Sequence, residues 1–182
     1  LSQANPVVFG VTYSPGYASA LGLNSKETYQ RMFKDLNIKK IRLSAYWDEI
    51  ELSPKEFDFA DLDYYILEAE KNNADVILAM GYKLPRWPEC RKPDWLKNAS
   101  IKERQAEQIK MLGMVIDYYT KINPKSNIKA IQLENEPLLS FGTCDPVDEA
   151  FFRQEVAFVR SKTSLPIIIT DSGELSSWIL PM

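Results

Sequence analysis

The sequence predicts a single α/β domain built on a parallel sheet. Apolar runs rich in β-branched residues alternate along the chain with segments of helical period. Strands that alternate with helices form parallel sheets with right-handed crossovers. No linker or low-complexity tract interrupts this alternation, so we expect residues 1–182 to form one domain. The five expected strands are Val7–Thr12, Ile38–Leu43, Asp75–Met80, Ile128–Leu133 and Pro166–Thr170.

Four helices are expected between these strands. The first follows Asn24-Ser-Lys-Glu27, which has the pattern of a capping box, and the second follows Asp58. A second capping box, Ser100-Ile-Lys-Glu103, begins the third helix, and Asp145-Pro146 supplies an N-cap and a first helical residue for the fourth. Apolar residues recur at helical spacing behind each start. They are Tyr29, Met32, Phe33 and Leu36; Leu62, Tyr65, Ile66 and Ala69; Ile109, Leu112, Ile116 and Tyr119; and Phe152, Val156 and Val159.

Composition excludes several classes of protein. The chain of 182 residues is 45% hydrophobic and 26% charged, which is ordinary for a globular domain. Its net charge is −3 without a basic stripe, so we expect no nucleic-acid partner. No apolar run approaches the roughly 20 residues of a membrane span. The chain has no histidine, and its two cysteines match no zinc spacing, so a metal site of the Cys/His type is excluded.

The loops that follow the expected strands are polar, aromatic and long. Roughly 20 residues separate Met80 from the helix start at Ser100, whereas the turns at the opposite strand ends are short. In parallel α/β proteins, catalytic groups collect at the carboxyl ends of the strands. We therefore expect a pocket at this edge of the sheet.

The segment Leu133-Glu-Asn-Glu-Pro137 is the strongest candidate site. It places two carboxylates and an amide where an apolar strand ends. Strand alternation predicts that Gln132, Glu134 and Glu136 share one side, and Pro137 biases Glu136 toward an extended backbone. A partly desolvated carboxylate has a raised pKa and can act as a general acid. The alternative is that Glu134 and Glu136 are loop charges without a task, but their place at a strand end favours function.

Arg42 interrupts an apolar strand, so it needs a partner. It could orient a catalytic carboxylate, or form a structural ion pair with Glu134 or another carboxylate, and both interpretations stay open.

Aromatic residues on the expected loops could contact a sugar. Trp47 and Trp87 directly follow strand ends, and their ring faces could stack on sugar rings or could cap the core. Tyr13 and Tyr82 are weaker candidates as pocket hydrogen-bonding groups.

Cys90 and Cys144 lie in the loops after two neighbouring strands. They form either a disulfide or two free thiols. A disulfide would favour an oxidising compartment, and with it an extracytoplasmic or secreted location.

Three segments together resemble the clan of (β/α)₈-barrel retaining glycoside hydrolases, which includes cellulase-like family 5 and β-galactosidase family 42. They are Ile41-Arg-Leu-Ser-Ala-Tyr-Trp-Asp-Glu-Ile-Glu51, Phe57-Asp-Phe-Ala-Asp-Leu-Asp63 and Gln132-Leu-Glu-Asn-Glu-Pro137. The resemblance implies a TIM-barrel fold, a carbohydrate substrate with a β-linked sugar, and no cofactor. It implies that Glu136 is the general acid/base, that Asn135 binds the sugar 2-hydroxyl and that Arg42 supports the nucleophile.

The chain departs from this clan in two respects. It lacks the histidines that many family 5 members carry around the site. A full barrel needs about 200 to 250 residues and eight strands, whereas five strands are expected here. We therefore expect a partial barrel of about five strand–helix units, the N-terminal part of a longer enzyme. The nucleophile would follow a seventh strand outside these residues, and the barrel would be completed by a C-terminal half or a second chain.

Other interpretations remain open. Glu134, Glu136, Asp171 and Glu174 could supply oxygen ligands for Mg²⁺ or Mn²⁺ in a metal-dependent sugar-converting enzyme. A non-catalytic partial barrel could bind glycans through Trp47 and Trp87. A doubly wound domain is the alternative fold, although no Gly-rich phosphate loop follows the first strand.

Overall fold

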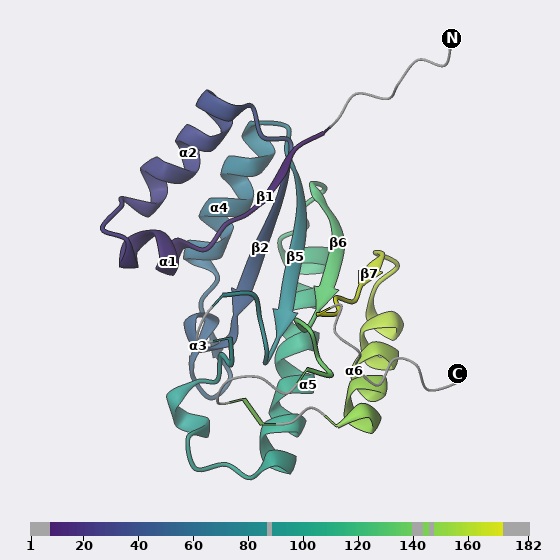
Figure 1. The fold of residues 1–182 in the computed structure, drawn as a ribbon. Helices are drawn as coiled ribbons and strands as arrows, with labels where there is room; N and C mark the ends of the chain where they lie inside the picture. Colours follow the sequence, from purple (N-terminus) through teal and green to yellow (C-terminus); the bar gives the residue numbers. More distant parts are fainter. Residues whose placement is uncertain (1–7, 87–88, 140–143, 146–147, 173–182) are drawn as a thin grey trace.

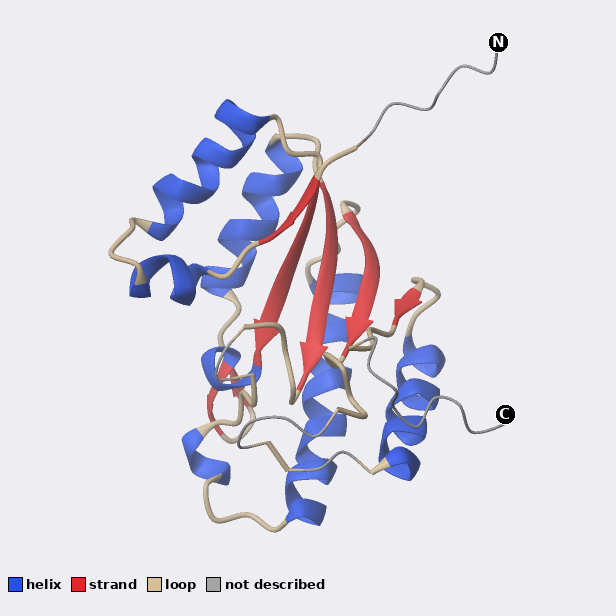
Figure 2. Ribbon diagram, in the orientation of Figure 1, coloured by secondary structure: helices blue, strands red, loops and turns tan. Residues whose placement is uncertain are grey.

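The protein contains a twisted five-stranded parallel sheet flanked by helices (Figures 1 and 2). The computed structural model describes residues 8–86, 89–139, 144–145 and 148–172. The strands are β1 (Gly10–Thr12), β2 (Lys40–Tyr46), β5 (Asp75–Gly81), β6 (Ile128–Leu133) and β7 (Ile167–Ile168).

Strand order in the sheet follows chain order, β1-β2-β5-β6-β7, and all neighbours are parallel. A doubly wound sheet reverses its strand order once, whereas a barrel wall does not. The described sheet is therefore part of a barrel wall, which confirms the predicted fold class.

Four helices connect or follow these strands: α2 (Ser25–Leu36), α4 (Ala60–Lys71), α5 (Ile101–Asp117) and α6 (Glu149–Lys162). A π-helical turn, Tyr118–Ile122, extends α5. None of the described helices has the length and apolar character needed to cross a membrane.

Several short elements were not predicted. They are α1 (Pro15–Ala20), α3 (Trp47–Ile50), a 3₁₀ turn at Asp94–Leu96 and a hairpin of β3 (Glu51–Ser53) and β4 (Glu56–Phe57). All of them lie in loops at or beyond the strand ends, where they shape the candidate edge of the sheet.

The helices α2 and α5 begin with the predicted capping residues. Ser100 and Glu103 form the full capping box of α5, and Asn24 Oδ1 accepts the backbone N–H of Glu27 at 3.1 Å. The prediction that Asp145 is the N-cap of α6 is wrong: Asp148 accepts the N–H of Phe151 and caps that helix. Asp145 pairs with Arg104 instead, at 3.4 Å.

The core lies between the helices and one face of the sheet. Alternate residues of β2, β5 and β6 pack there against the apolar stripes of the four helices. The sheet residues are Ile41, Leu43, Ala45, Val76, Leu78, Met80, Ile131 and Leu133. The opposite face, which would be the barrel interior, carries polar groups such as Arg42, Ser44 and Gln132.

Candidate active site at the end of β6

A chain of polar side chains runs across the inner face of the sheet toward Asn135. Arg42 donates to Thr12 Oγ1 at 3.0 Å and to Gln132 Oε1 at 2.6 Å. Gln132 in turn donates to Asn135 Oδ1 at 3.3 Å and to the carbonyl of Glu134 at 2.9 Å. Arg42 on β2 thus reaches past β5 to Gln132 on β6. Gln132 in turn holds the side-chain amide of Asn135.

These contacts decide against one of the two structural interpretations of Arg42. Among the residues that the structure describes, its hydrogen-bond partners are neutral side chains, so of the two interpretations left open the ion pair with Glu134 does not form. Burial lowers the pKa of Arg42 from its usual value. Arg42 acts on Asn135 through Gln132, whose part in the site was not predicted.

Asn135 and Glu136 lie on a tight turn that begins where β6 ends. Glu134 and Glu136 have φ of +57° and +48°, in the left-handed region that non-glycine residues seldom adopt. The predicted extended backbone at Glu136 is therefore wrong, because the tight turn overrides the bias that Pro137 imposes. The Asn135 N–H donates to the Lys83 carbonyl at 2.7 Å, and the Glu136 N–H donates to Thr170 Oγ1 at 3.1 Å.

Glu134 lies on the opposite side of this turn from the predicted one. Its carboxylate is 1% exposed and accepts the backbone N–H groups of Tyr82 and Lys83 at 2.8 and 2.6 Å. Gln108 of α5 donates to it at 2.6 Å, so the side chain faces the helices while Gln132 faces the barrel interior. Strand alternation failed here because β6 ends at Leu133 and the left-handed turn follows.

Gly81 makes room for this carboxylate. The glycine has φ of +143°, and a Cβ at its position would collide with the Glu134 carboxylate. The close approach of Glu134 to the end of β5 therefore requires glycine there.

Glu134 forms a buried pair with Glu155 of α6, and Gln108 also donates to Glu155. Burial raises the pKa of Glu134 to about 7, although the N–H groups of Tyr82 and Lys83 oppose the shift. Burial, and then the charge of Glu134, raise the pKa of Glu155 well above its ordinary value. Because Glu134 accepts from three donors, we infer that Glu134 ionises first and Glu155 retains the proton.

The sequence of α5 carries a signal for this buried pair. Arg104 and Gln108 occupy the same stripe of α5 as Met111 and Val115, and all four are buried. Polar residues at apolar stripe positions indicate a buried polar network. Lys83, by contrast, stands in a loop with no periodicity to mark it.

The aromatic candidates lie mostly in the interior. Trp47 is fully buried, donates to Glu51 Oε2 at 2.7 Å and contacts the ring of Trp95, so it has no face for a sugar and the stacking prediction is wrong. Tyr82 is 3% exposed beneath the Arg104 guanidinium, and Tyr13 is also buried. Trp87 lies outside the described residues.

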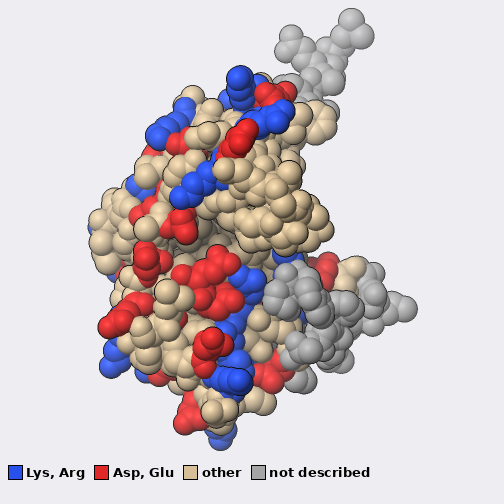
Figure 3. Space-filling model, turned by 90° about the vertical axis from the view of Figure 1, so that its left-hand side faces the viewer, with Lys and Arg blue, Asp and Glu red and all other residues tan. Residues whose placement is uncertain are grey.

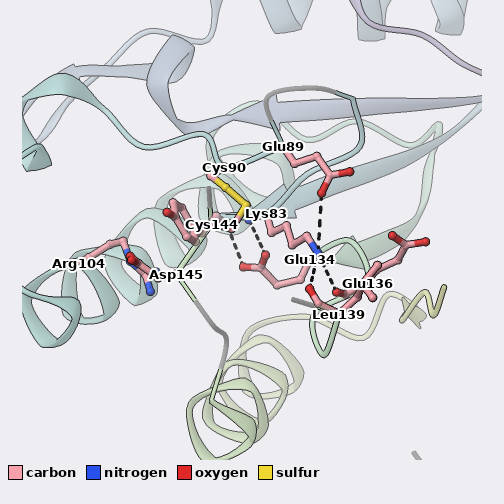
Figure 4. Close-up of a disulfide and its surroundings, with 10 residues drawn as sticks. Lys83, Glu89, Cys90, Arg104, Glu134, Glu136, Leu139, Cys144 and Asp145 are labelled. Atoms are coloured by element: carbon pink, nitrogen blue, oxygen red, sulfur yellow. Dashed lines mark hydrogen bonds and ion pairs between the residues drawn. A yellow bond between two sulfur atoms is a disulfide. The ribbon is translucent and has the colours of Figure 1, made fainter. Parts of the chain in front are cut away.

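A disulfide joins Cys90 and Cys144, which resolves the two alternatives that the sequence left open (Figure 4). It links the loop after β5 to the loop after β6, with a Cα–Cα distance of 5.4 Å. Both loops carry residues that contact the Asn135–Glu136 turn. In Figure 4 the Glu136 carboxylate points away from that of Glu134.

A cavity of about 540 Å³ lies beside the carboxyl end of β2. Its lining includes Ser44 and Tyr46 together with four acidic residues, Asp48, Glu49, Asp58 and Asp61. Figure 3 shows acidic side chains gathered beside a hollow on this side of the molecule. Neither Asn135 nor Glu136 is among the lining residues, so this cavity is separate from the turn after β6.

The described members of the proposed set of oxygen ligands form no metal site. Within the residues that the structure describes, no three Asp, Glu, Cys or His side chains are placed to hold a metal ion. Glu134 faces the helices, Asp171 is exposed, and Glu174 lies outside the described residues.

The chain shares its fold with solved structures of glycoside hydrolases. A GH5_18 protein from Bifidobacterium longum subsp. infantis aligns with a TM-score of 0.66 and 15% identity, over 90% of this chain and 43% of that one. A GH5_18 protein from Streptomyces cattleya, solved in complex with GlcNAc, aligns with a TM-score of 0.65 and 14% identity, over 93% and 45%. A family 39 glycoside hydrolase from Bacteroides cellulosilyticus WH2 gives 0.58 and 15%, over 90% and 33%.

These likenesses concern the fold, and this chain spans less than half the length of each of these three proteins. No protein-family profile matches the chain, and no curated protein matches it significantly. The chain therefore has the fold of part of a glycoside hydrolase barrel.

Proposed function

We propose that this chain forms the acid/base half of the active site of a retaining glycoside hydrolase that cleaves a β-linked sugar. The observation that carries the proposal is the Asn135–Glu136 turn at the carboxyl end of β6, the fourth strand of a barrel wall. Both residues have fixed backbones, and Asn135 is also held through its side chain. The shared fold with glycoside hydrolases gives independent support for a carbohydrate substrate.

In this proposal Glu136 transfers protons in both steps. A carboxylate from outside these residues attacks the anomeric carbon while Glu136 protonates the leaving oxygen, and the glycosidic bond breaks. In the second step the ionised Glu136 takes a proton from a water molecule. The oxygen of that water attacks the same carbon, and the bond between the sugar and the nucleophile breaks. Asn135 donates to the sugar 2-hydroxyl, and Arg42 supports the site by holding Gln132, which holds Asn135.

Glu136→Gln in the intact enzyme tests this proposal. We expect hydrolysis of alkyl glycosides to fall about 10² to 10⁴-fold, because their leaving oxygen must be protonated as the bond breaks. For glycosides with acidic phenol leaving groups, the rate of the bond-breaking step should fall much less. This rate is measured from the initial burst of released phenol.

Glu27→Gln is the matched control, since Glu27 is an exposed glutamate on α2. It should leave both rates unchanged. Near-normal alkyl glycoside hydrolysis by Glu136→Gln would sink the proposal. Calorimetric sugar binding by the wild-type protein without any turnover would favour a glycan-binding module instead.

A further inference from the structure

Lys83 is a buried cation next to the proposed acid/base. The residue follows β5 and is 1% exposed. Its ammonium donates to the carbonyls of Leu139 at 2.8 Å and Glu136 at 3.2 Å, and lies 3.7 Å from the Glu89 carboxylate (Figure 4). Burying an ammonium group is costly unless it is paired, so these contacts hold the side chain in one place.

The backbone of Lys83 contacts the same turn. Its N–H donates to the Glu134 carboxylate at 2.6 Å, and its carbonyl accepts the Asn135 N–H at 2.7 Å. Lys83 therefore contacts Glu134, Asn135, Glu136 and Leu139 through three separate groups. Among these contacts, only those of the ammonium can be removed by changing the side chain.

The turn that Lys83 holds has an unfavourable backbone conformation. Left-handed φ is unfavourable for the two non-glycine residues Glu134 and Glu136, and such conformations persist only where surrounding contacts fix them. The ammonium bonds two carbonyls of the turn, one of them that of Glu136 itself. Without this ammonium the Glu136 carbonyl would lose a hydrogen bond that fixes the backbone of the residue. The direction of the Glu136 side chain depends on that backbone.

We propose that Lys83 is a positioning residue, which holds the Glu136 carboxyl group where it can protonate the leaving oxygen. This inference rests on the proposed function of Glu136. Lys83 touches no substrate in this scheme and acts only through the carbonyls of Glu136 and Leu139. Its loss should therefore harm proton transfer more than any other part of catalysis.

Lys83→Met in the intact enzyme tests the proposal, because methionine keeps the apolar stem and removes the charge. The measurement is the ratio of kcat/KM for a phenyl glycoside with an acidic leaving group to kcat/KM for the corresponding alkyl glycoside. The ratio is independent of the amount of folded enzyme, so a variant that folds poorly still gives an answer. We expect the ratio to rise about tenfold to a hundredfold, the effect of misplacing a catalytic group by about 1 Å.

Lys129→Met is the matched control, since Lys129 is an exposed lysine at the opposite end of β6. The ratio for Lys129→Met should equal that of the wild type. The ratio for Lys83→Arg should lie between those of the wild type and Lys83→Met. An unchanged ratio in Lys83→Met overturns the inference if Glu136→Gln raises the same ratio. If Glu136→Gln leaves the ratio unchanged as well, the proposed function itself fails.

Discussion

Glu134 and Glu136 are two residues apart, and the turn between them gives their carboxyl groups different surroundings. Glu134 accepts three N–H groups in the interior, and Glu136 remains partly exposed at the strand end. The local sequence could not separate them, because alternation assumes that the strand continues past Leu133. Only the contacts of Tyr82, Lys83 and Gln108, distant in sequence, decide which side Glu134 faces.

The Glu134–Glu155 pair should make stability fall as pH rises. Both carboxyl groups have raised pKa in the folded protein, so they bind protons there that the unfolded chain releases. Their contribution to the free energy of unfolding is complete below the ordinary pKa of 4.5. The contribution of Glu134 is lost as the pH rises from there toward 7. The loss from Glu134 is on the order of 3 kcal/mol.

Glu155→Gln removes one titrating group and the negative charge beside Glu134. Urea denaturation at about pH 5 and about pH 8 should therefore show a smaller difference in unfolding free energy for this variant than for the wild type. The exposed Glu149 of the same helix supplies the control, Glu149→Gln, which should keep the wild-type difference. An equal difference in all three proteins would contradict a buried proton-sharing pair.

At the scale of elements, the Cys90–Cys144 disulfide restrains the loops after β5 and β6. The bond closes a separation of 54 residues, and the chain-entropy relation gives about 4 kcal/mol for such a loop. We expect the double variant Cys90→Ser, Cys144→Ser to lower Tm by roughly 10 °C. Calorimetry with and without reductant measures this: reductant should lower the Tm of the wild type and leave the variant unchanged. Equal Tm values for both proteins would argue against the restraint.

Sequence periodicity predicted the main elements because it reports local structure. β6 has its predicted bounds, and the capping box at Ser100 marks the start of α5. The start of α6 was misplaced because Asp145 and Asp148 are both good caps, and the ion pair of Asp145 with Arg104 depends on tertiary contacts. The β3–β4 hairpin was not predicted because its strands, three and two residues long, are too short to show an alternating pattern.

At the scale of the whole molecule, the described sheet has two short outer strands. β1 has three residues and β7 has two, so few backbone groups at either edge of the sheet are hydrogen-bonded to a neighbouring strand. Large apolar side chains adjoin both: Phe9 before β1 is 72% exposed, and Ile169 after β7 is 39% exposed. In a closed barrel these positions would be next to further strands. Unpaired strand edges with exposed apolar residues favour association between chains.

The 182-residue chain, when produced alone, should therefore self-associate. Sedimentation velocity should show larger species as the protein concentration rises, and the double variant Phe9→Lys, Ile169→Lys should reduce them, because a charge at each edge opposes strand pairing. Leu67→Lys is the matched control, since Leu67 is 38% exposed on α4, away from the sheet edges. If Leu67→Lys reduced association equally, the effect would come from added charge and not from the edges. A wild-type chain that stays monomeric throughout would show that β1 and β7 need no neighbouring strand.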